Sequence, residues 1–155
     1  LSDKAFCMLT EYFAQVERPV IVCMVGDHAP SFAGSIVSEA YTEEECNLQL
    51  RKVPLLYWAN FEMEEIALDT VSMNYVVPLL LELADMPVSP YYGYLQQARE
   101  QVPVISSYGR YFDADGNMYL YSEEGENPFR SVVDNYILEY HSLKEGKTQP
   151  LYQPY

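Results

Sequence analysis

Residues 19–32 read PVIVCMVGDHAPSF, a short apolar run followed at once by glycine, aspartate and histidine. The run from Val20 to Val25 is continuous and β-branched, which is typical of a strand buried on both faces of a mostly parallel sheet. Residues 53–58, VPLLYW, repeat this pattern further along the chain. Two such strands joined by a long connection predict an α/β fold.

Helical patterns precede and follow the first strand. Residues 2–16 carry apolar side chains at three- and four-residue steps, which predicts a helix with one buried stripe that ends before Pro19. Residues 29–49 are expected to form a loop. Within it, Thr42 and Glu45 have the spacing of a capping box and predict one short helical turn.

Two further helices are expected in the middle of the chain. The first covers residues 75–85, with Ser72 or Asn74 as its N-cap. The second covers residues 91–101, where Ser89 provides the cap and the proline after it occupies the first helical position.

The periodicity changes near Val102. Residues 104–112 and 118–121 flank the turn-rich segment DADGN at 113–117, which predicts a β-hairpin. The aspartates suggest a calcium loop, but the glycine comes two positions early for the EF-hand pattern and no glutamate closes the loop. We therefore interpret the segment as a structural turn.

A last helix is expected after Asn127 and Pro128, with apolar residues of 129–143 on one face and Gly146 at its end. Helices packed on a sheet thus give way to a hairpin and a terminal helix. We place a subdomain boundary at this change, so the predicted parts are residues 1–102 and residues 103–155.

Composition excludes several classes of protein. The 155 residues suit one domain, and 9 basic against 23 acidic residues give a net charge of −14, which argues against a nucleic-acid partner. Three cysteines without CxxC spacing indicate neither a disulfide framework nor a zinc knuckle. No membrane span or signal peptide is predicted within this sequence, which starts at Leu1 and is interpreted as a processed product or a piece of a longer protein.

Asp27 and His28 are the candidate site residues. They follow a predicted strand directly, and ligands of open α/β sheets gather at the carboxyl ends of strands. A carboxylate oxygen and an imidazole nitrogen are a usual ligand pair for Zn²⁺ or Mn²⁺. The structural alternative is that Asp27 caps a turn and His28 donates to a backbone carbonyl. His141 and Trp58 are interpreted as structural residues.

Three stretches together carry a resemblance to a known family. PVIVCMVGDHAPSF (19–32), VPLLYWANF (53–61) and YVVPLLLELADMPVSPYYGYL (75–95) resemble the C-terminal part of sulfatase-like proteins of the alkaline phosphatase superfamily. The resemblance is to the lipoteichoic acid synthase and phosphoglycerol transferase group. It runs from about residue 2 to residue 146, and the GDH-x-P segment with the PLLYW strand is its sharpest portion.

The resemblance implies a fold and an activity. The chain would be the C-terminal fragment of an alkaline phosphatase-like sandwich: a parallel-sheet edge with helices, then a small antiparallel hairpin and a terminal helix. The whole protein would act on the extracytoplasmic face of a bacterial membrane, tethered by upstream helices. It would transfer glycerophosphate from phosphatidylglycerol to a glycan or polymer of the cell envelope through a covalent phospho-enzyme. In the family, the Asp-His pair of GDH ligates a divalent metal, usually Mn²⁺ with Zn²⁺ or Mg²⁺ as alternatives, and this pair matches Asp27 and His28.

The sequence also departs from the family. The nucleophilic threonine, the acidic metal ligand and the residues that bind glycerophosphate belong to the N-terminal half, and nothing here matches them; Thr10, Thr42, Thr70 and Thr148 lack the expected setting. We therefore expect no catalytic nucleophile in this chain, which would be inactive without the N-terminal half. An uncovered sheet edge is expected to favour self-association. The alternatives are a sulfatase or phosphodiesterase of the same superfamily, and a non-catalytic binding module.

Overall fold

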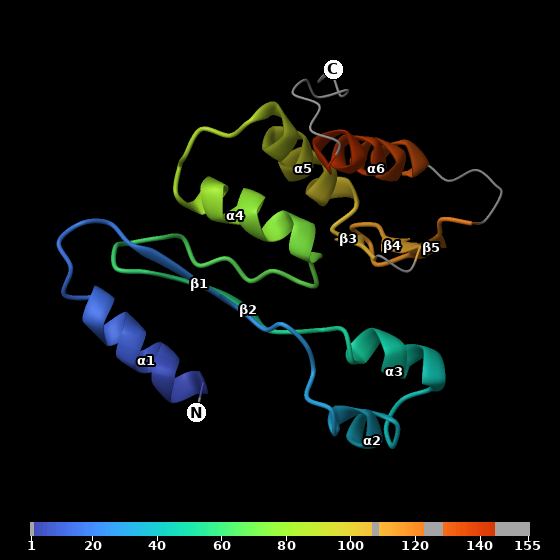
Figure 1. The fold of residues 1–155 in the computed structure, drawn as a ribbon, viewed down its shortest axis with the longest axis horizontal. Helices are drawn as coiled ribbons and strands as arrows, with labels where there is room; N and C mark the ends of the chain where they lie inside the picture. The colour runs from blue at the N-terminus through green and yellow to red at the C-terminus, as the bar shows by residue number, and fades with distance from the viewer. Residues whose placement is uncertain (1, 107–108, 123–128, 145–155) are drawn as a thin grey trace. The chain divides into compact units, whose positions relative to one another are not determined.

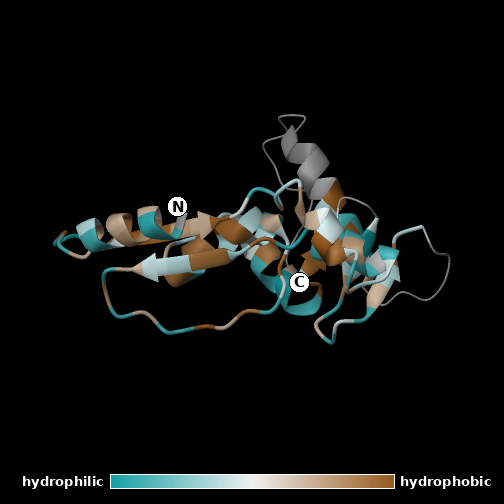
Figure 2. Ribbon diagram, turned by 90° about the horizontal axis from the view of Figure 1, so that it is seen from below, coloured by the Kyte–Doolittle hydropathy of each residue, from teal (hydrophilic) through white to brown (hydrophobic). Residues whose placement is uncertain are grey.

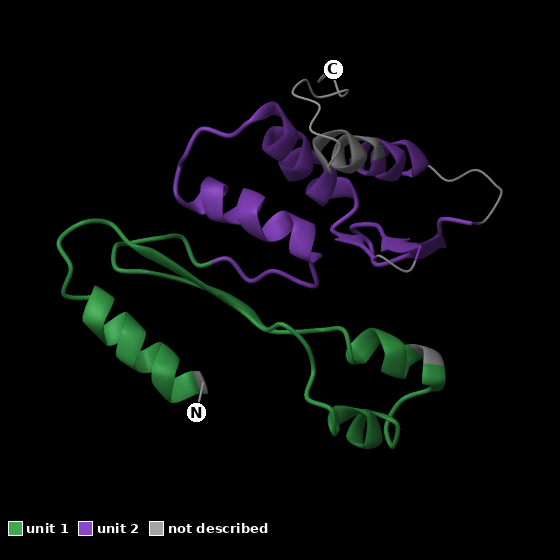
Figure 3. Ribbon diagram, in the orientation of Figure 1, with its two compact units in different colours: residues 1–65 green, residues 66–155 purple. Residues whose placement is uncertain are grey.

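The computed structural model describes residues 2–106, 109–122 and 129–144, which form two compact units (Figure 3). Unit 1 comprises residues 1–65 and unit 2 residues 66–155. Both units mix helices with short strands, and each contains one small antiparallel sheet. The predicted mixture of helix and strand is therefore confirmed in general terms.

Unit 1 is built around a two-stranded ribbon. Its elements are α1 (Ser2–Phe13), β1 (Ile21–Val25), α2 (Ala33–Val37), α3 (Glu43–Gln49) and β2 (Leu55–Ala59) (Figure 1). The two predicted strands are present, but they pair with each other antiparallel, whereas the sequence pattern suggested a parallel sheet. The reason is that the connection through α2 and α3 returns the chain to the end of the ribbon that it left, while a parallel pair needs a crossover to the other end.

The apolar stripe of α1 is only partly covered, whereas a buried stripe was expected. Leu9 and Tyr12 are 42% and 67% exposed, while Phe6 and Phe13 are half-buried. The strands are apolar along much of their length (Figure 2) yet only half-buried, and Val25 and Leu56 are exposed. Unit 1 therefore has apolar residues in the pattern of a core, but none of its described side chains is buried.

The connection between the strands is more helical than predicted. The sequence indicated a loop with one helical turn, and the structure contains the five-residue helix α2 in addition. The predicted capping box of α3 is confirmed. Thr42 Oγ1 accepts from the Glu45 amide at 3.4 Å, and Glu45 Oε2 accepts from the Thr42 amide at 2.8 Å.

Unit 2 packs helices against a three-stranded sheet. Its elements are η1 (Met73–Tyr75), α4 (Val76–Leu83), α5 (Pro90–Gln101), β3 (Val104–Ile105), β4 (Arg110–Phe112), β5 (Met118–Leu120) and α6 (Arg130–Lys144). The sheet order is β3-β4-β5, and both pairings are antiparallel. The predicted hairpin is confirmed as β4 and β5. Its first arm is divided into β3 and β4, which pair antiparallel, and Gly109 directly before β4 has a φ of 72°.

The core of unit 2 is closed by its own elements. Its buried apolar residues are Tyr75, Leu79, Tyr94, Leu95, Ala98, Val102, Tyr111 and Val133. Val102 packs with Tyr111 of the sheet and Val133 of α6, and Tyr75 Oη donates to the Val102 carbonyl at 2.7 Å. The predicted subdomain boundary at residues 102–103 falls inside this unit.

The predicted helix caps of unit 2 have different outcomes. Ser89 accepts from the Tyr92 amide at 3.3 Å and caps α5 as expected. Ser72 makes no cap bond, because its hydroxyl accepts from the Ile105 amide at 2.7 Å and donates to the Pro103 carbonyl. The predicted cap of the last helix at 127–128, its end at Gly146 and the terminal tail lie outside the described residues.

Candidate metal-ligand pair

The ribbon of unit 1 ends immediately before Asp27. The last bond of the ladder joins the Gly26 amide to the Pro54 carbonyl at 3.0 Å, one residue beyond the pair Val25 and Leu55. Asp27 is thus the first residue after the hydrogen-bonded ladder, so its side chain is free to turn outward. It lies at the end of the ribbon from which the chain continues into α2 and α3.

Asn60 fixes the other end of the ribbon. Its Oδ1 accepts from the Val20 amide at 2.8 Å, and its backbone amide donates to the Val20 carbonyl at 3.1 Å. Its Nδ2 donates to the carbonyls of Phe13, Val16 and Arg18 at 3.1, 2.8 and 3.0 Å. One amide side chain therefore ties the end of α1, the following turn and the start of β1 to the end of β2.

The sequence predicted a strand over residues 53–58, and no role was predicted for Asn60. A signal was present, because an amide side chain directly after an apolar strand has both a donor and an acceptor for the backbone beside it. The partners themselves, 40 to 47 residues away in the chain, could be identified only from the structure.

The two ends together fix the register of the ribbon. Val20 pairs with Asn60 at one end and Gly26 with Pro54 at the other, with an unbroken ladder of five pairs between them. A slip by one residue would turn every side chain to the opposite face. The register therefore decides where Asp27 and His28 emerge.

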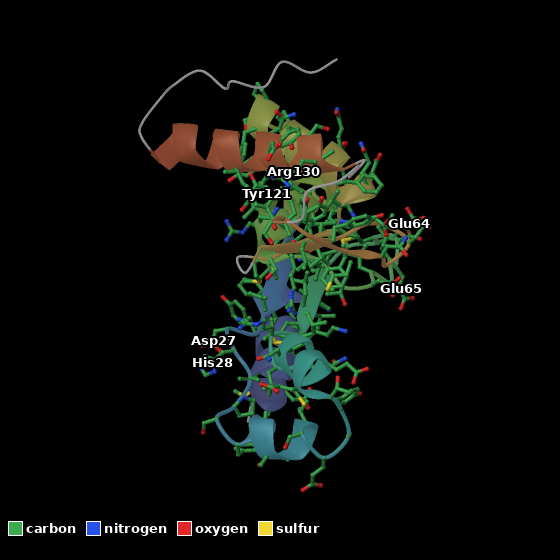
Figure 4. All side chains as sticks on the ribbon, turned by 90° about the vertical axis from the view of Figure 1, so that its right-hand side faces the viewer. Asp27, His28, Glu64, Glu65, Tyr121 and Arg130 are labelled. Atoms are coloured by element: carbon green, nitrogen blue, oxygen red, sulfur yellow. The ribbon has the colours of Figure 1, made fainter. Side chains whose placement is uncertain are left out.

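Asp27 and His28 lie side by side at the outer edge of unit 1 (Figure 4). Asp27 Oδ1 accepts from the His28 amide at 2.9 Å, and His28 Nδ1 lies 2.9 Å from the Ala29 carbonyl oxygen. His28 Nε2 lies 3.3 Å from Asp27 Oδ2, and the two side chains are 76% and 87% exposed. The turn-cap contact and the backbone contact of the structural alternative are both present, and the other two polar atoms, Oδ2 and Nε2, contact each other.

The separation of Asp27 Oδ2 and His28 Nε2 is compatible with two ligands of one divalent ion. The Ala29 carbonyl can only accept, so Nδ1 carries the proton and Nε2 of a neutral ring carries a lone pair. Nε2 lies 3.3 Å from a carboxylate oxygen, Asp27 Oδ2. Two ligands each about 2.1 Å from one ion and 3.3 Å apart subtend about 100° at the ion, close to tetrahedral or octahedral angles.

The described residues bring no third ligand to the pair. Within the described ranges, no group of three or more His, Cys, Asp or Glu residues could hold a metal ion. Glu64 and Glu65 of the same unit lie on the opposite side of the view in Figure 4. Glu45 is engaged in the capping box of α3. A metal ion at Asp27 and His28 would therefore need ligands from outside the described residues.

Asp113 of the DADGN turn has its oxygens occupied by protein donors. Oδ1 accepts from the amides of Asp115 and Asn117, and Oδ2 accepts from the Asn117 side chain and Tyr119 Oη. These bonds, the one from the Asn117 side chain above all, hold the pKa of Asp113 below its ordinary value. The contacts agree with the structural interpretation of this turn.

The remaining candidates add no ligand or nucleophile to the pair. Trp58 lies half-buried in β2 opposite Val22. Cys23 is a free thiol whose pKa is raised by burial. His141 lies in α6, and its side chain is outside the described part of the structure.

The comparisons with known proteins returned no match: no family model, no curated protein and no solved structure resembles the chain at the level required. Among the described residues, no helix has both the length and the apolar character needed to cross a membrane.

Proposed function

We propose that this chain is the C-terminal part of a metal-dependent phosphoglycerol transferase, in which Asp27 and His28 supply two ligands of a divalent metal. The observation that carries the proposal is the matched pair of Asp27 Oδ2 and His28 Nε2, 3.3 Å apart, at the end of β1. Their order within GDH-x-P is the order that the resemblance assigns to metal ligands.

Each residue of the pair has a defined part in this proposal. Asp27 contributes one negative oxygen, while its second oxygen holds the backbone of His28. His28 contributes Nε2, and the Ala29 carbonyl fixes the tautomer that leaves this nitrogen free to bind. Bound Mn²⁺ would polarise a phosphoryl oxygen and lower the pKa of a nucleophilic hydroxyl, which we expect upstream of this chain.

The exposed apolar surface of unit 1 supports the proposal that this chain is one part of a larger catalytic domain. The stripe of α1 and the half-buried strands have the pattern of core residues, yet the described residues of unit 1 cover them only in part. In the proposed protein, the N-terminal half of an alkaline phosphatase-like sandwich covers this surface and supplies the threonine and the acidic ligand. Upstream helices then hold the domain on the extracytoplasmic face of a bacterial membrane, where it meets a lipid-linked glycerophosphate donor.

The test uses the native gene product that contains this chain. Asp27→Ala and His28→Ala are expected to lower glycerophosphate transfer and Mn²⁺ affinity at least about 100-fold, because each removes a direct ligand. Both side chains are mostly exposed, so the thermal midpoint of unfolding should change little. Glu39→Ala, which removes another exposed acid of unit 1, is the control that should leave both readouts unchanged.

Retained turnover in both variants would show that the assignment is wrong. Hydrolysis of sulfate esters or phosphodiesters, lost in the same two variants while phosphatidylglycerol is not consumed, would favour the sulfatase or phosphodiesterase alternative. A native product without metal affinity or turnover would favour the binding module.

A further inference from the structure

The backbone of Gly26 lies unusually close to the neighbouring strand. A methyl group placed on Gly26 would lie 2.9 Å from Val53 Cβ and 3.1 Å from Pro54 Cδ. Glycines with positive φ in the described ranges are Gly109 and Gly116, so the conformation of Gly26 is one that other residues adopt. The position therefore requires glycine for space.

This close approach occurs at the residue before the ligand pair. The Gly26 amide is bound to the Pro54 carbonyl, so any outward shift of Gly26 weakens the last bond of the ladder and moves Asp27 and His28 with it. Metal ligands must be held within about 0.5 Å of their productive geometry. A clash with a Cβ atom at 2.9 Å is relieved only by a backbone shift, because neither partner is the end of a flexible side chain.

We propose that the contact between Gly26 and Val53 positions the metal-ligand pair, so that the missing Cβ at residue 26 and the Cβ of Val53 together set where Asp27 and His28 emerge. Gly26 and Val53 are positioning residues and touch no ligand themselves. The inference rests on the proposed metal role of Asp27 and His28.

The experiment measures Mn²⁺ binding to the native gene product by electron paramagnetic resonance, as a dissociation constant and as the spectrum at saturating Mn²⁺. Gly26→Ala is expected to raise the dissociation constant about tenfold or more and to change the spectrum of bound Mn²⁺. Gly34→Ala is the matched control, because a methyl group on Gly34 of α2 meets nothing within 4 Å. It should bind Mn²⁺ as the wild type does.

Two double variants make the test specific for the Cβ contact. Gly26→Ala with Val53→Gly removes the nearer of the two close contacts, Val53 Cβ, and leaves Pro54 Cδ at 3.1 Å, so it should bind Mn²⁺ about threefold or more tighter than Gly26→Ala with Val53→Ala. Gly26→Ala with Val53→Ala removes only the γ-methyl groups and keeps the Cβ, so it should remain defective. If Gly26→Ala alone does not fold, this comparison still decides, since both double variants carry the same substitution of Gly26.

The outcomes separate this inference from the proposed function. If Asp27→Ala and His28→Ala bind Mn²⁺ as the wild type does, both the proposed function and this inference are overturned. Normal binding with an unchanged spectrum in Gly26→Ala, or equal rescue by Val53→Ala and Val53→Gly, overturns the positioning role alone. A purely structural effect of Gly26→Ala would lower the amount of bound Mn²⁺ but leave its spectrum unaltered, and that result also contradicts the inference.

Discussion

The two units of this protein differ in how far their apolar side chains are buried. Every described side chain that is buried belongs to unit 2, where Leu95 and Val102 are almost fully covered. Unit 1 has none, although its helix and strands carry apolar stripes of the same kind. An apolar pattern in a sequence thus indicates which faces of a helix or strand are suited to burial. Only the structure shows which other element covers them.

Polar contacts replace a core in unit 1. The ribbon is held by its ladder, by Asn60 at one end and by the Gly26–Pro54 bond at the other. Unit 2 also uses buried hydrogen bonds, such as the one from Tyr75 Oη to the Val102 carbonyl, but there they lie inside an apolar core. The comparison predicts that the two units respond differently to equivalent mutations.

The largest effect is expected from truncating leucine in the core of unit 2. Leu95→Ala should lower the free energy of unfolding of unit 2 by about 2–5 kcal/mol, because it empties a site that is 1% exposed. Leu9→Ala makes the same chemical change on the exposed stripe of α1 and should stay within about 0.5 kcal/mol. Urea unfolding of the 155-residue chain, with amide exchange of α5 as the local probe, measures both.

If the two leucine variants of this chain lose the same free energy of unfolding, the proposed difference between the two units is wrong. The same two substitutions in the native gene product give a second test. If the proposed N-terminal half covers α1, Leu9→Ala becomes a core truncation there and its cost approaches that of Leu95→Ala.

The next effect concerns the polar end of the ribbon. Asn60→Ala removes the acceptor of the Val20 amide and the donor of three carbonyls, and it should destabilise unit 1 by about 2 kcal/mol. Trp58 is the single tryptophan and lies in β2, so its fluorescence reports unit 1 during unfolding. The exchange protection of the Val20 amide should fall in parallel.

Two further variants test whether the amide itself is responsible. Asn60→Asp keeps the size and the acceptor but turns a carboxylate toward carbonyl oxygens, so it should be at least as damaging as Asn60→Ala. Asn47→Ala removes an exposed asparagine with one intrahelical bond and should have little effect. A wild-type unfolding curve for Asn60→Asp would contradict the role assigned to Asn60.

Local signals in the sequence predicted local structure well. Most helices, both strands of the ribbon, the capping box at Thr42 and the cap at Ser89 depend on contacts within a few residues, and the structure contains them. The short helix α2, in a segment predicted as a loop, was missed. Signals that depend on distant partners failed. Ser72 matches the pattern of an N-cap, but its hydroxyl binds the chain at Pro103 and Ile105 instead, and the direction of the ribbon was set by a connection whose path the pattern did not show.

The candidate site follows the same rule. Asp27 and His28 were found because they are adjacent to each other and to a strand, which is information carried by consecutive residues. The backbone partners of Asn60 and the close approach of Val53 to Gly26 involve residues far apart in the chain, so the sequence did not identify them. The tautomer of His28 depends on the Ala29 carbonyl, whose orientation only the structure shows.

The smallest effect is expected from the turn of unit 2, because it is confined to acidic pH. Asp113 has a pKa below its ordinary value of 3.8, chiefly because the Asn117 side chain donates to it. Above that ordinary value the carboxylate is charged in both the folded and the unfolded chain, and its stabilising bonds are fully present. As the pH falls toward the lowered pKa, the unfolded chain takes up the proton first, so this contribution is lost.

Asn117→Ala should therefore raise the pKa of Asp113 toward 3.8 and weaken the loss of stability in acid. A ¹³C NMR titration of the Asp113 carboxyl measures the first effect, and urea unfolding of unit 2 between neutral and acidic pH measures the second. Asp115→Ala keeps the backbone amide that donates to Asp113 and serves as the control that should retain the wild-type acid dependence. An unchanged Asp113 titration in Asn117→Ala would mean that the backbone amides and Tyr119 alone hold the carboxylate, and the turn would then depend on main-chain geometry as strongly as the ribbon of unit 1 does.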